Sequence, residues 1–322
     1  MTRHESSGGA VRLAIFKNRS VATTPEVEVL IAADAPVAIG VSGGKDSSAV
    51  AIATVEYLDR VGHKGPRILI HSDLGLMEWQ ASLPMCQILA DRLGLELVVV
   101  RREKGGMMER WEQRWADNVA RYASLSCVQL ILPWSTPDMR FCTSELKTDI
   151  ICRALSRRYG GLTILSVTGI RRQESSGRAK APIAKPEPKL TSVTRVTQGV
   201  TWNPIIEWSI DDVFGLLRER GMPLHEAYTV YGTSRVSCFN CIMASDADLV
   251  AANKCVANHA GSRRVIRLET ISTFGFKGNR WLGDLVPDLL TLEERVNLRK
   301  AKDAAAYRAT AEGNDLLGSP AA

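Results

Sequence analysis

The chain has 322 residues, of which 45% are hydrophobic, so it can bury a sizeable core in one large domain or two small ones. No apolar run approaches the roughly 18 residues of a membrane span, and the charged start MTRHESS precedes no signal-peptide apolar region, which predicts a cytoplasmic protein. The 41 Lys and Arg residues exceed the 35 Asp and Glu residues, and this net charge of +6 favours anionic partners such as nucleotides or nucleic acid.

Strands and helices are predicted to alternate over the first half of the chain. Runs rich in Val, Ile and Leu predict buried strands at residues 36–41, 66–73, 95–103 and 162–170. Apolar residues at helical spacing predict helices at 46–62, 77–94, 107–123 and 146–160. Such alternation is typical of a doubly wound α/β fold with a mostly parallel sheet covered on both faces. Ligands bind beyond the carboxyl ends of such strands, so we expect the clusters SGGKDS, HSD, RREK and GIRRQES to converge on one crevice.

A change of composition after about residue 180 indicates four parts. Residues 1–25 are expected to be poorly ordered, and residues 26–180 to form the α/β core. Residues 181–200 are rich in Pro and Lys and predict a basic, flexible flap; seven cations face two carboxylates between Arg171 and Arg195. Residues 201–322 predict a smaller, mainly helical region, in which capping-box patterns open helices after Ser209 and Thr291.

The stretch Ser42-Gly43-Gly44-Lys45-Asp46-Ser47 lies between the first predicted strand and a helix. It fails as a Walker A loop, because Gly40 lies too close to Gly44 and Asp46 follows Lys45; its glycine spacing also fails the dinucleotide fingerprint. The glycines still free backbone N–H groups to form an anion nest beside the positive end of the helix. Lys45 adds a charge, Ser42 and Ser47 add hydroxyl donors, and Asp46 is a candidate magnesium ligand. The alternative is an ordinary glycine-rich turn with a surface lysine.

Several blocks of sequence resemble the N-type ATP pyrophosphatases, the PP-loop superfamily that includes the adenylyl-sulfate and phosphoadenylyl-sulfate (PAPS) reductases. The blocks are SGGKDS, ILIHSDLG, RFCTSELK at 140–147, TGIRRQES at 168–175, NPIIEWSIDDV at 203–213 and CFNC at 238–241. The resemblance implies an adenine nucleotide alpha hydrolase-like fold with residues 26–180 as the nucleotide-binding core. It also implies that the loop binds the pyrophosphate part of ATP, whose α–β bond is broken.

The same resemblance implies roles for individual residues. Pyrophosphate would lie against Ser42, Gly43, Gly44, Lys45 and Ser47, with Asp46 on magnesium. Asp73 would lie near the adenosine, although a polar strand end is an equal alternative. Gly169, Arg171 and Arg172 match a second nucleotide-facing motif, in which a guanidinium suits the charge developing at the α-phosphorus.

The branch of the superfamily is indicated by two features. The tail AEGNDLLGSPAA lacks the cysteine of assimilatory reductases, and the intact SGGKDS loop favours ATP over PAPS. RFCTSELK together with CFNC resembles DNA-phosphorothioation ATP pyrophosphatases, phage or mobile-element relatives and iron–sulfur-dependent tRNA thiolases. The resemblance implies adenylation of a substrate oxygen for sulfur insertion, on DNA or tRNA, with a cysteine desulfurase or another sulfur-relay subunit as partner. A sulfonucleotide reductase and a nucleotide-binding regulatory subunit with little turnover remain alternatives.

Seven cysteines in a cytosolic chain do not indicate a disulfide framework. Cys238 and Cys241 have the spacing that lets two thiolates hold one metal or cluster. The resemblance places Cys142 near the same crevice, which implies a [4Fe–4S] cluster with one open iron, and Cys255 is a weaker fourth candidate. Structural zinc and a metal-free redox pair are the alternatives. The other three, Cys86, Cys127 and Cys152, sit among apolar neighbours and are expected in the core.

Overall fold

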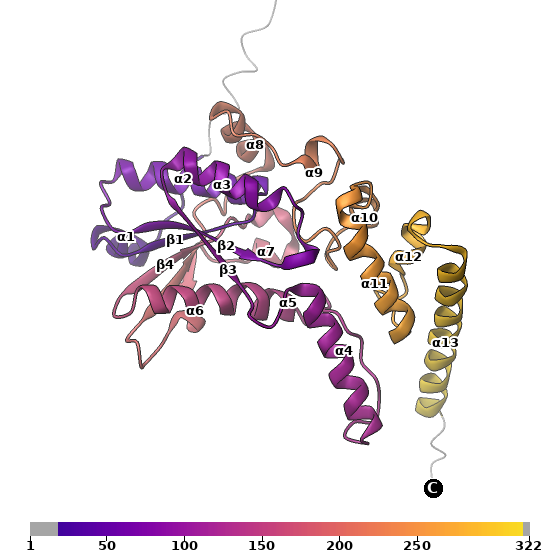
Figure 1. The fold of residues 1–322 in the computed structure, drawn as a ribbon. Coiled ribbons are helices and arrows are strands. Elements are labelled where there is room, and N and C mark those ends of the chain that lie inside the picture. The colour runs from indigo at the N-terminus through magenta and orange to yellow at the C-terminus, as the bar shows by residue number, and fades with distance from the viewer. Residues whose placement is uncertain (1–18, 318–322) are drawn as a thin grey trace, which may run out of the picture. The chain divides into compact units, whose positions relative to one another are not determined.

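A computed structural model of the chain describes residues 19–317. Its chain forms two compact units, each assembled from separate stretches of sequence. The first unit contains Met1–His71, Ser82–Val100 and Ile151–His225; the second contains Ser72–Ala81, Arg101–Ile150 and Glu226–Ala322. Figure 1 labels the helices and strands of both. The sequence predicted contiguous parts, whereas the middle of the chain packs with its C-terminal third.

A six-stranded sheet in the order β3-β2-β1-β4-β6-β5 organises the first unit. Its strands are β1 (Val37–Val41), β2 (Arg67–Asp73), β3 (Glu96–Arg101), β4 (Thr163–Val167), β5 (Ala184–Pro186) and β6 (Gln198–Trp202). β1 pairs in parallel with β2 and β4, and β4 pairs in parallel with β6. The predicted α/β fold with a mostly parallel sheet is therefore confirmed.

Both faces of this sheet are covered. The helices of the unit are α1 (Pro25–Ala32), α2 (Lys45–Arg60), α3 (Ser82–Leu93), α6 (Asp149–Arg158), α7 (Ser176–Ala179) and α8 (Ile210–Glu219). Because side chains alternate along a strand, Val37, Ile39 and Val41 face a core shared with α1, α2, α3 and α8. Ala38 faces the other core, with Ile164 and with Leu155 of α6. Figure 1 shows α2 and α3 on one side of the strands and α6 on the other.

The segment predicted as a flexible flap forms part of the sheet. β5 pairs antiparallel with β6, and the Glu187 N–H donates to the Gly199 carbonyl oxygen at 2.7 Å. Leu190 is fully buried against Gly199, where any Cβ would lie 2.4 Å from the leucine side chain. Backbone pairing and one buried leucine thus fix a stretch whose Pro and Lys content indicated mobility.

Part of the segment predicted to be poorly ordered is also packed. The indoles of Trp202 and Trp208 donate to the carbonyl oxygens of Ala22 and Ser20 at 2.7 and 3.0 Å. The Ala22 N–H donates to the Pro204 carbonyl oxygen, and Thr24 caps α1. Residues 19–24 therefore run along the first unit, while the rest of the predicted segment, residues 1–18, lies outside the described residues.

The second unit is mainly helical, as expected for the C-terminal region. Its helices are α4 (Met107–Ala123), α5 (Phe141–Thr143), α9 (Glu226–Thr229), α10 (Asp246–Ala252), α11 (His259–Ser272), α12 (Leu282–Leu285) and α13 (Leu292–Leu317). Trp111, Trp134 and Phe276 meet edge to face at its centre, with ring centroids 5.4 to 6.5 Å apart. Among the described residues, no helix combines the length and apolar character needed to cross a membrane.

Glu269 of α11 is completely buried beside this aromatic core. Its carboxylate accepts backbone N–H groups from Phe276, Leu282 and Gly283 at 2.7, 2.7 and 3.2 Å. Burial outweighs these hydrogen bonds and raises the pKa of Glu269 to about 8. One acidic side chain thus organises the loop after α11 and the start of α12.

This raised pKa predicts that the second unit loses stability as the pH rises from about 4.5, the ordinary Glu value, to about 8. Over this range the folded state holds a proton that the unfolded chain releases, so unfolding becomes easier with rising pH. Glu269→Gln should flatten the dependence, and Glu293→Gln, on the exposed start of α13, should leave it unchanged. Urea unfolding followed by tryptophan fluorescence measures it, since five of seven tryptophans lie in this unit. Identical pH profiles for the wild type and Glu269→Gln would contradict the assignment.

Candidate functional site

The loop between β1 and α2 closes on itself. Gly43 has a φ of +72°, and a Cβ there would lie 2.8 Å from the Ser82 carbonyl oxygen, so both conformation and space require glycine. The Ser42 N–H donates to the Ser47 Oγ at 3.2 Å, and that hydroxyl donates to the Gly44 carbonyl oxygen at 2.8 Å. The loop therefore has a defined shape at the entrance to α2.

The loop leads into the N-terminus of a long helix. α2 runs for 16 residues, and its N-cap, Gly44, has no side chain that could occupy the first turn. The first turn of a helix presents backbone N–H groups and a partial positive charge. A glycine loop that ends at such a turn is suited to bind a phosphate or another anion.

Two cations converge on Asp46 in this first turn. The Lys45 Nζ lies 3.0 Å from Asp46 Oδ2, and the Arg171 Nε lies 2.8 Å from Asp46 Oδ1. Both cationic residues are buried, with exposed fractions of 7% for Lys45 and 4% for Arg171. The structure thus brings the SGGKDS and TGIRRQES segments together at the carboxyl edge of β1 and β4.

Arg171 is fixed from several directions. Its Nη1 donates to the Gln173 Oε1 at 3.3 Å and to the Trp208 carbonyl oxygen at 3.4 Å. Gln173 in turn accepts the Ile210 N–H at the start of α8. Gln173 was not predicted as a site residue, because a glutamine by itself indicates no particular chemistry. Its position inside the TGIRRQES segment is the signal that could have indicated it.

Gly169 allows β4 to approach α2. A Cβ at this position would lie 2.7 Å from the Asp46 carbonyl oxygen and 3.0 Å from Val50. The glycine therefore contributes to the site by close backbone packing, which holds Arg171 within reach of Asp46. Its direct contact with a nucleotide stays a prediction.

Arg172 points elsewhere. It forms an ion pair with Glu207 and donates to the Ala181 carbonyl oxygen at 3.2 and 3.3 Å. The described contacts thus join Arg171, and not Arg172, to the loop of residues 42–47, the phosphate loop. A role for Arg172 at the α-phosphorus stays a prediction.

Asp73, at the end of β2, belongs to the second unit. Its Oδ1 accepts the Gly75 N–H at 2.7 Å, and its Oδ2 lies 3.6 Å from Arg101. These contacts stabilise the turn that follows the strand. These contacts are consistent with the alternative prediction for Asp73, a polar residue at the end of a strand with no role in nucleotide binding.

A group of thiols lies in the second unit. Cys241 accepts a hydrogen bond from Cys238, which lowers the pKa of Cys241, and the Met243 N–H and Arg235 act in the same direction. The same hydrogen bond, together with burial, raises the pKa of Cys238. Cys142 lies near enough to Cys238 to raise the pKa of Cys238 further. The second unit thus contains a hydrogen-bonded pair of cysteines with a third sulfur nearby.

The donor chemistry of these thiols suits a cluster or zinc, but the grouping is incomplete. In the part of the chain that the structure describes, no three His, Cys, Asp or Glu side chains are arranged to hold a metal ion. Cys255 is engaged separately, since its hydrogen bond with Tyr231 raises the pKa of Tyr231 to about 12. Cys86 and Cys152 are buried, as expected for core residues, whereas Cys127 is half-buried.

A buried strand, a glycine loop and a helix with a buried lysine in its first turn form a combination that is suited to binding a phosphate group. Residues 36–244 match the phosphoadenosine phosphosulfate reductase domain family. The chain belongs to this family, as the sequence blocks predicted.

Two curated relatives share sequence with the chain. An uncharacterized 37.8 kDa protein of Escherichia phage 186 is 28% identical over an alignment of 248 residues, which covers 66% of this chain and 68% of the phage protein. The uncharacterized protein MJ0066 of Methanocaldococcus jannaschii is 26% identical over 207 residues, 64% of this chain. The match spans only 36% of the length of MJ0066.

Solved structures resemble the chain more distantly. A PAPS reductase from Candida auris, in a phosphate complex, is 14% identical with a TM-score of 0.41, covering 69% of this chain and 98% of its own. The U34-tRNA thiolase NcsA of Methanococcus maripaludis, with its [4Fe–4S] cluster, is 14% identical with a TM-score of 0.37, covering 85% and 73%. An FMN adenylyltransferase of Candida glabrata is 15% identical with a TM-score of 0.34, covering 63% and 54%.

The geometry of the loop predicts unequal costs for two glycine substitutions. Gly43→Ala should destabilise the first unit through its positive φ and through contact with Ser82, whereas Gly62→Ala has a similar φ of +80° and no atom within 4 Å. The backbone term alone costs roughly 1–2 kcal/mol at either site. The additional loss at Gly43 is measured by chemical denaturation followed by far-UV circular dichroism. Equal losses for the two variants would show that Ser82 does not confine the loop.

Proposed function

We propose that the protein is an ATP pyrophosphatase that adenylates a substrate oxygen, so that sulfur can replace that oxygen on a nucleic acid. In the first step the substrate oxygen attacks the α-phosphorus, the α–β bond breaks, and the β and γ phosphates leave together as pyrophosphate. In the second step a sulfur nucleophile displaces AMP. The observation that carries the proposal is the buried Lys45 at the start of α2, beside a glycine loop and linked through Asp46 to Arg171.

The ion pairs at the loop suit the binding of a pyrophosphate group. Phosphoryl and adenylyl transfer depend mostly on positioning and on charge stabilisation, which fixed N–H groups and cations supply. Asp46 is shared between Lys45 and Arg171. Arg171 is buried and also held by Gln173 and Trp208, so it can retain Asp46 while the Lys45 ammonium turns to a phosphate oxygen.

Magnesium would neutralise phosphate charge in such a reaction, and Asp46 is the loop carboxylate predicted to hold it. Both oxygens of Asp46 are engaged by cations in this structure. A carboxylate has about four lone-pair sites, so Asp46 can accept a magnesium ion beside these ion pairs or in place of one.

The charge distribution supports a nucleic-acid acceptor. Residues 151–225, the last stretch of the first unit, contain 12 Lys and Arg residues and 6 Asp and Glu residues. Several of these cations, including Lys180, Lys185 and Arg195, are exposed. Polyanions bind such surfaces by releasing counterions, which favours DNA or tRNA over a small neutral substrate.

The thiols of the second unit are the proposed route for sulfur. Cys238 and Cys241 form a hydrogen-bonded pair, and Cys142 is their neighbour. Thiolates of this kind hold an iron–sulfur cluster, hold zinc, or act as a metal-free redox pair. We propose the cluster, with sulfur supplied by a cysteine desulfurase or another relay subunit.

The family match favours one alternative, a reductase that releases sulfite from a sulfonucleotide. Such an enzyme uses a substrate with no β–γ pyrophosphate. The two functions therefore differ in their products.

Lys45→Ala is expected to reduce ATP-dependent pyrophosphate release by at least about a hundredfold, because it removes the ammonium that stabilises the leaving group. Release is measured by a coupled assay with DNA or tRNA present. Lys64→Ala, an exposed lysine after α2, serves as the control and should retain full activity. Orthophosphate as the product, or sulfite from PAPS without pyrophosphate from ATP, would contradict the proposal.

Anaerobically purified protein is expected to contain iron and to show a broad visible absorbance. Cys142→Ser, Cys238→Ser and Cys241→Ser should each remove most of the iron, because a cluster with three thiolate ligands does not survive the loss of one. Cys152→Ser, at a buried position of the first unit, is the matched control. Stoichiometric zinc, or no metal, would exclude the cluster and leave the thiol pair as a structural zinc site or a redox pair.

A further inference from the structure

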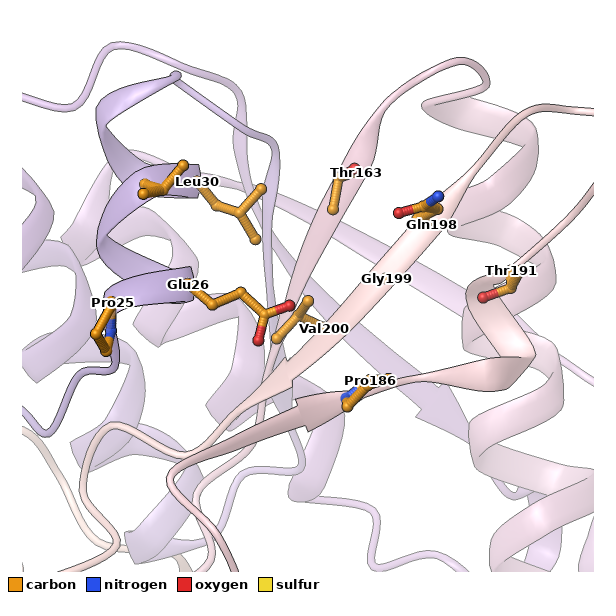
Figure 2. A pocket seen from close by; sticks show the side chains of 10 residues that line it. Pro25, Glu26, Leu30, Thr163, Pro186, Thr191, Gln198, Gly199 and Val200 are labelled. Carbon is orange, nitrogen blue, oxygen red and sulfur yellow. The ribbon is translucent and has the colours of Figure 1, made fainter.

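A second site of different character lies in the first unit. A cavity of about 590 Å³ opens between α1 and the strands β4, β5 and β6. Pro25, Glu26 and Leu30 of α1 line one side, and Thr163, Pro186 and Val200 line the other (Figure 2). This volume falls in the range of small-molecule sites, roughly 300–1,000 Å³.

The cavity lies at the amino-terminal ends of the parallel strands, and the phosphate loop lies at their carboxyl-terminal ends. Thr163 and Gln198, which line the cavity, are the first residues of β4 and β6. β4 is parallel to β1, and β6 is parallel to β4. The phosphate loop follows the last residue of β1. Because β1, β4 and β6 are parallel, the starts of β4 and β6 lie at the opposite end of the sheet from the last residue of β1. The cavity is therefore separate from the loop.

Glu26 is the charged residue among those that line the cavity, and its side chain is exposed to solvent. Figure 2 shows its carboxylate reaching toward Val200. Among residues 19–317, no hydrogen bond or ion pair engages this carboxylate, whereas Glu28 on the same helix accepts the Thr23 hydroxyl at 2.7 Å. Lys185 precedes Pro186 in β5 and points to the opposite face, because neighbouring residues alternate along a strand.

The remaining lining is apolar with a few neutral polar groups. Leu30, Val200 and the two prolines provide apolar walls, and Thr163 and Gln198 provide a hydroxyl and an amide. Such a lining accommodates a ligand with an apolar body, while a small number of polar groups sets its orientation.

Apolar side chains within and next to the lining segments are exposed. Val29 of α1 lines the cavity itself, and Leu162 directly precedes Thr163. The turn between Thr191 and Gln198 exposes 92% of Val193 and 74% of Val196. Val196 has a φ of +51°, a conformation that is rare and costly for a β-branched residue and is concentrated at functional sites.

We propose that this cavity binds a small organic cation, an amine or guanidinium group carried on an apolar or aromatic body. The cationic group pairs with Glu26, and the body lies between the prolines, Leu30 and Val200. The site is independent of the proposed ATP chemistry, since it shares no residue with the phosphate loop.

Tryptamine, an aromatic amine, is the probe for this proposal, and isothermal titration calorimetry on the full chain is the measurement. Tryptamine should bind the wild type, and Glu26→Gln should weaken binding about tenfold or more through loss of a charge-assisted hydrogen bond. Glu28→Gln is the matched control, because it removes the same charge from the same helix turn without touching the cavity. Indole-3-acetate, with the same ring and the opposite charge, should not bind.

A second variant tests the cavity without changing its charge. Thr191→Trp places a large side chain at an exposed lining position and should also weaken tryptamine binding. ATP binding at the loop should be unchanged in each variant, which separates this proposal from the proposed function. No binding of tryptamine, equal binding by Glu26→Gln, or equal binding of indole-3-acetate would overturn it.

Discussion

The ion pair between Asp46 and Arg171 is the interaction on which the candidate site depends. It joins the first turn of α2 to the segment after β4, across 125 positions of sequence. Gly169 makes the approach possible, because any side chain there would meet the Asp46 carbonyl oxygen. Gln173 and Trp208 also accept hydrogen bonds from the guanidinium, so three residues hold Arg171 at the loop. A fixed arginine and a buried lysine therefore meet at one carboxylate.

This arrangement separates two roles that the residue types alone do not distinguish. Arg171 and Arg172 are adjacent and chemically identical, yet one is buried against Asp46 and the other pairs with Glu207. Burial strengthens an ion pair by removing competing water, and it also makes the loss of either partner costly. Arg171 is thus part of the framework of the loop, whereas Arg172 links that framework to the outer segment around Ala181.

Much of the first unit could be predicted from sequence, because its information is local. The apolar run Val37–Val41 and the glycine, lysine and serine pattern of SGGKDS each report on a few neighbouring residues. The rest depended on contacts distant in sequence. β5 lies in a Pro- and Lys-rich stretch without a strand pattern and is defined by its partner, β6. Ser82, which confines Gly43, carries no pattern of its own, and the packing of Trp111 on Phe276 leaves no periodic signal in either segment.

The second unit has a consequence for how the chain is made. Its aromatic centre takes Trp111 and Trp134 from the middle of the chain and Phe276 from the last third. A growing polypeptide therefore exposes two large indoles until residues beyond 276 have left the ribosome. The last strand of the first unit ends at Trp202, so the sheet can form while the indoles of Trp111 and Trp134 are still exposed. During synthesis the chain can therefore hold a folded first unit and an unfolded second unit with exposed aromatic side chains. Partly folded chains of this kind are prone to aggregate and are bound by chaperones.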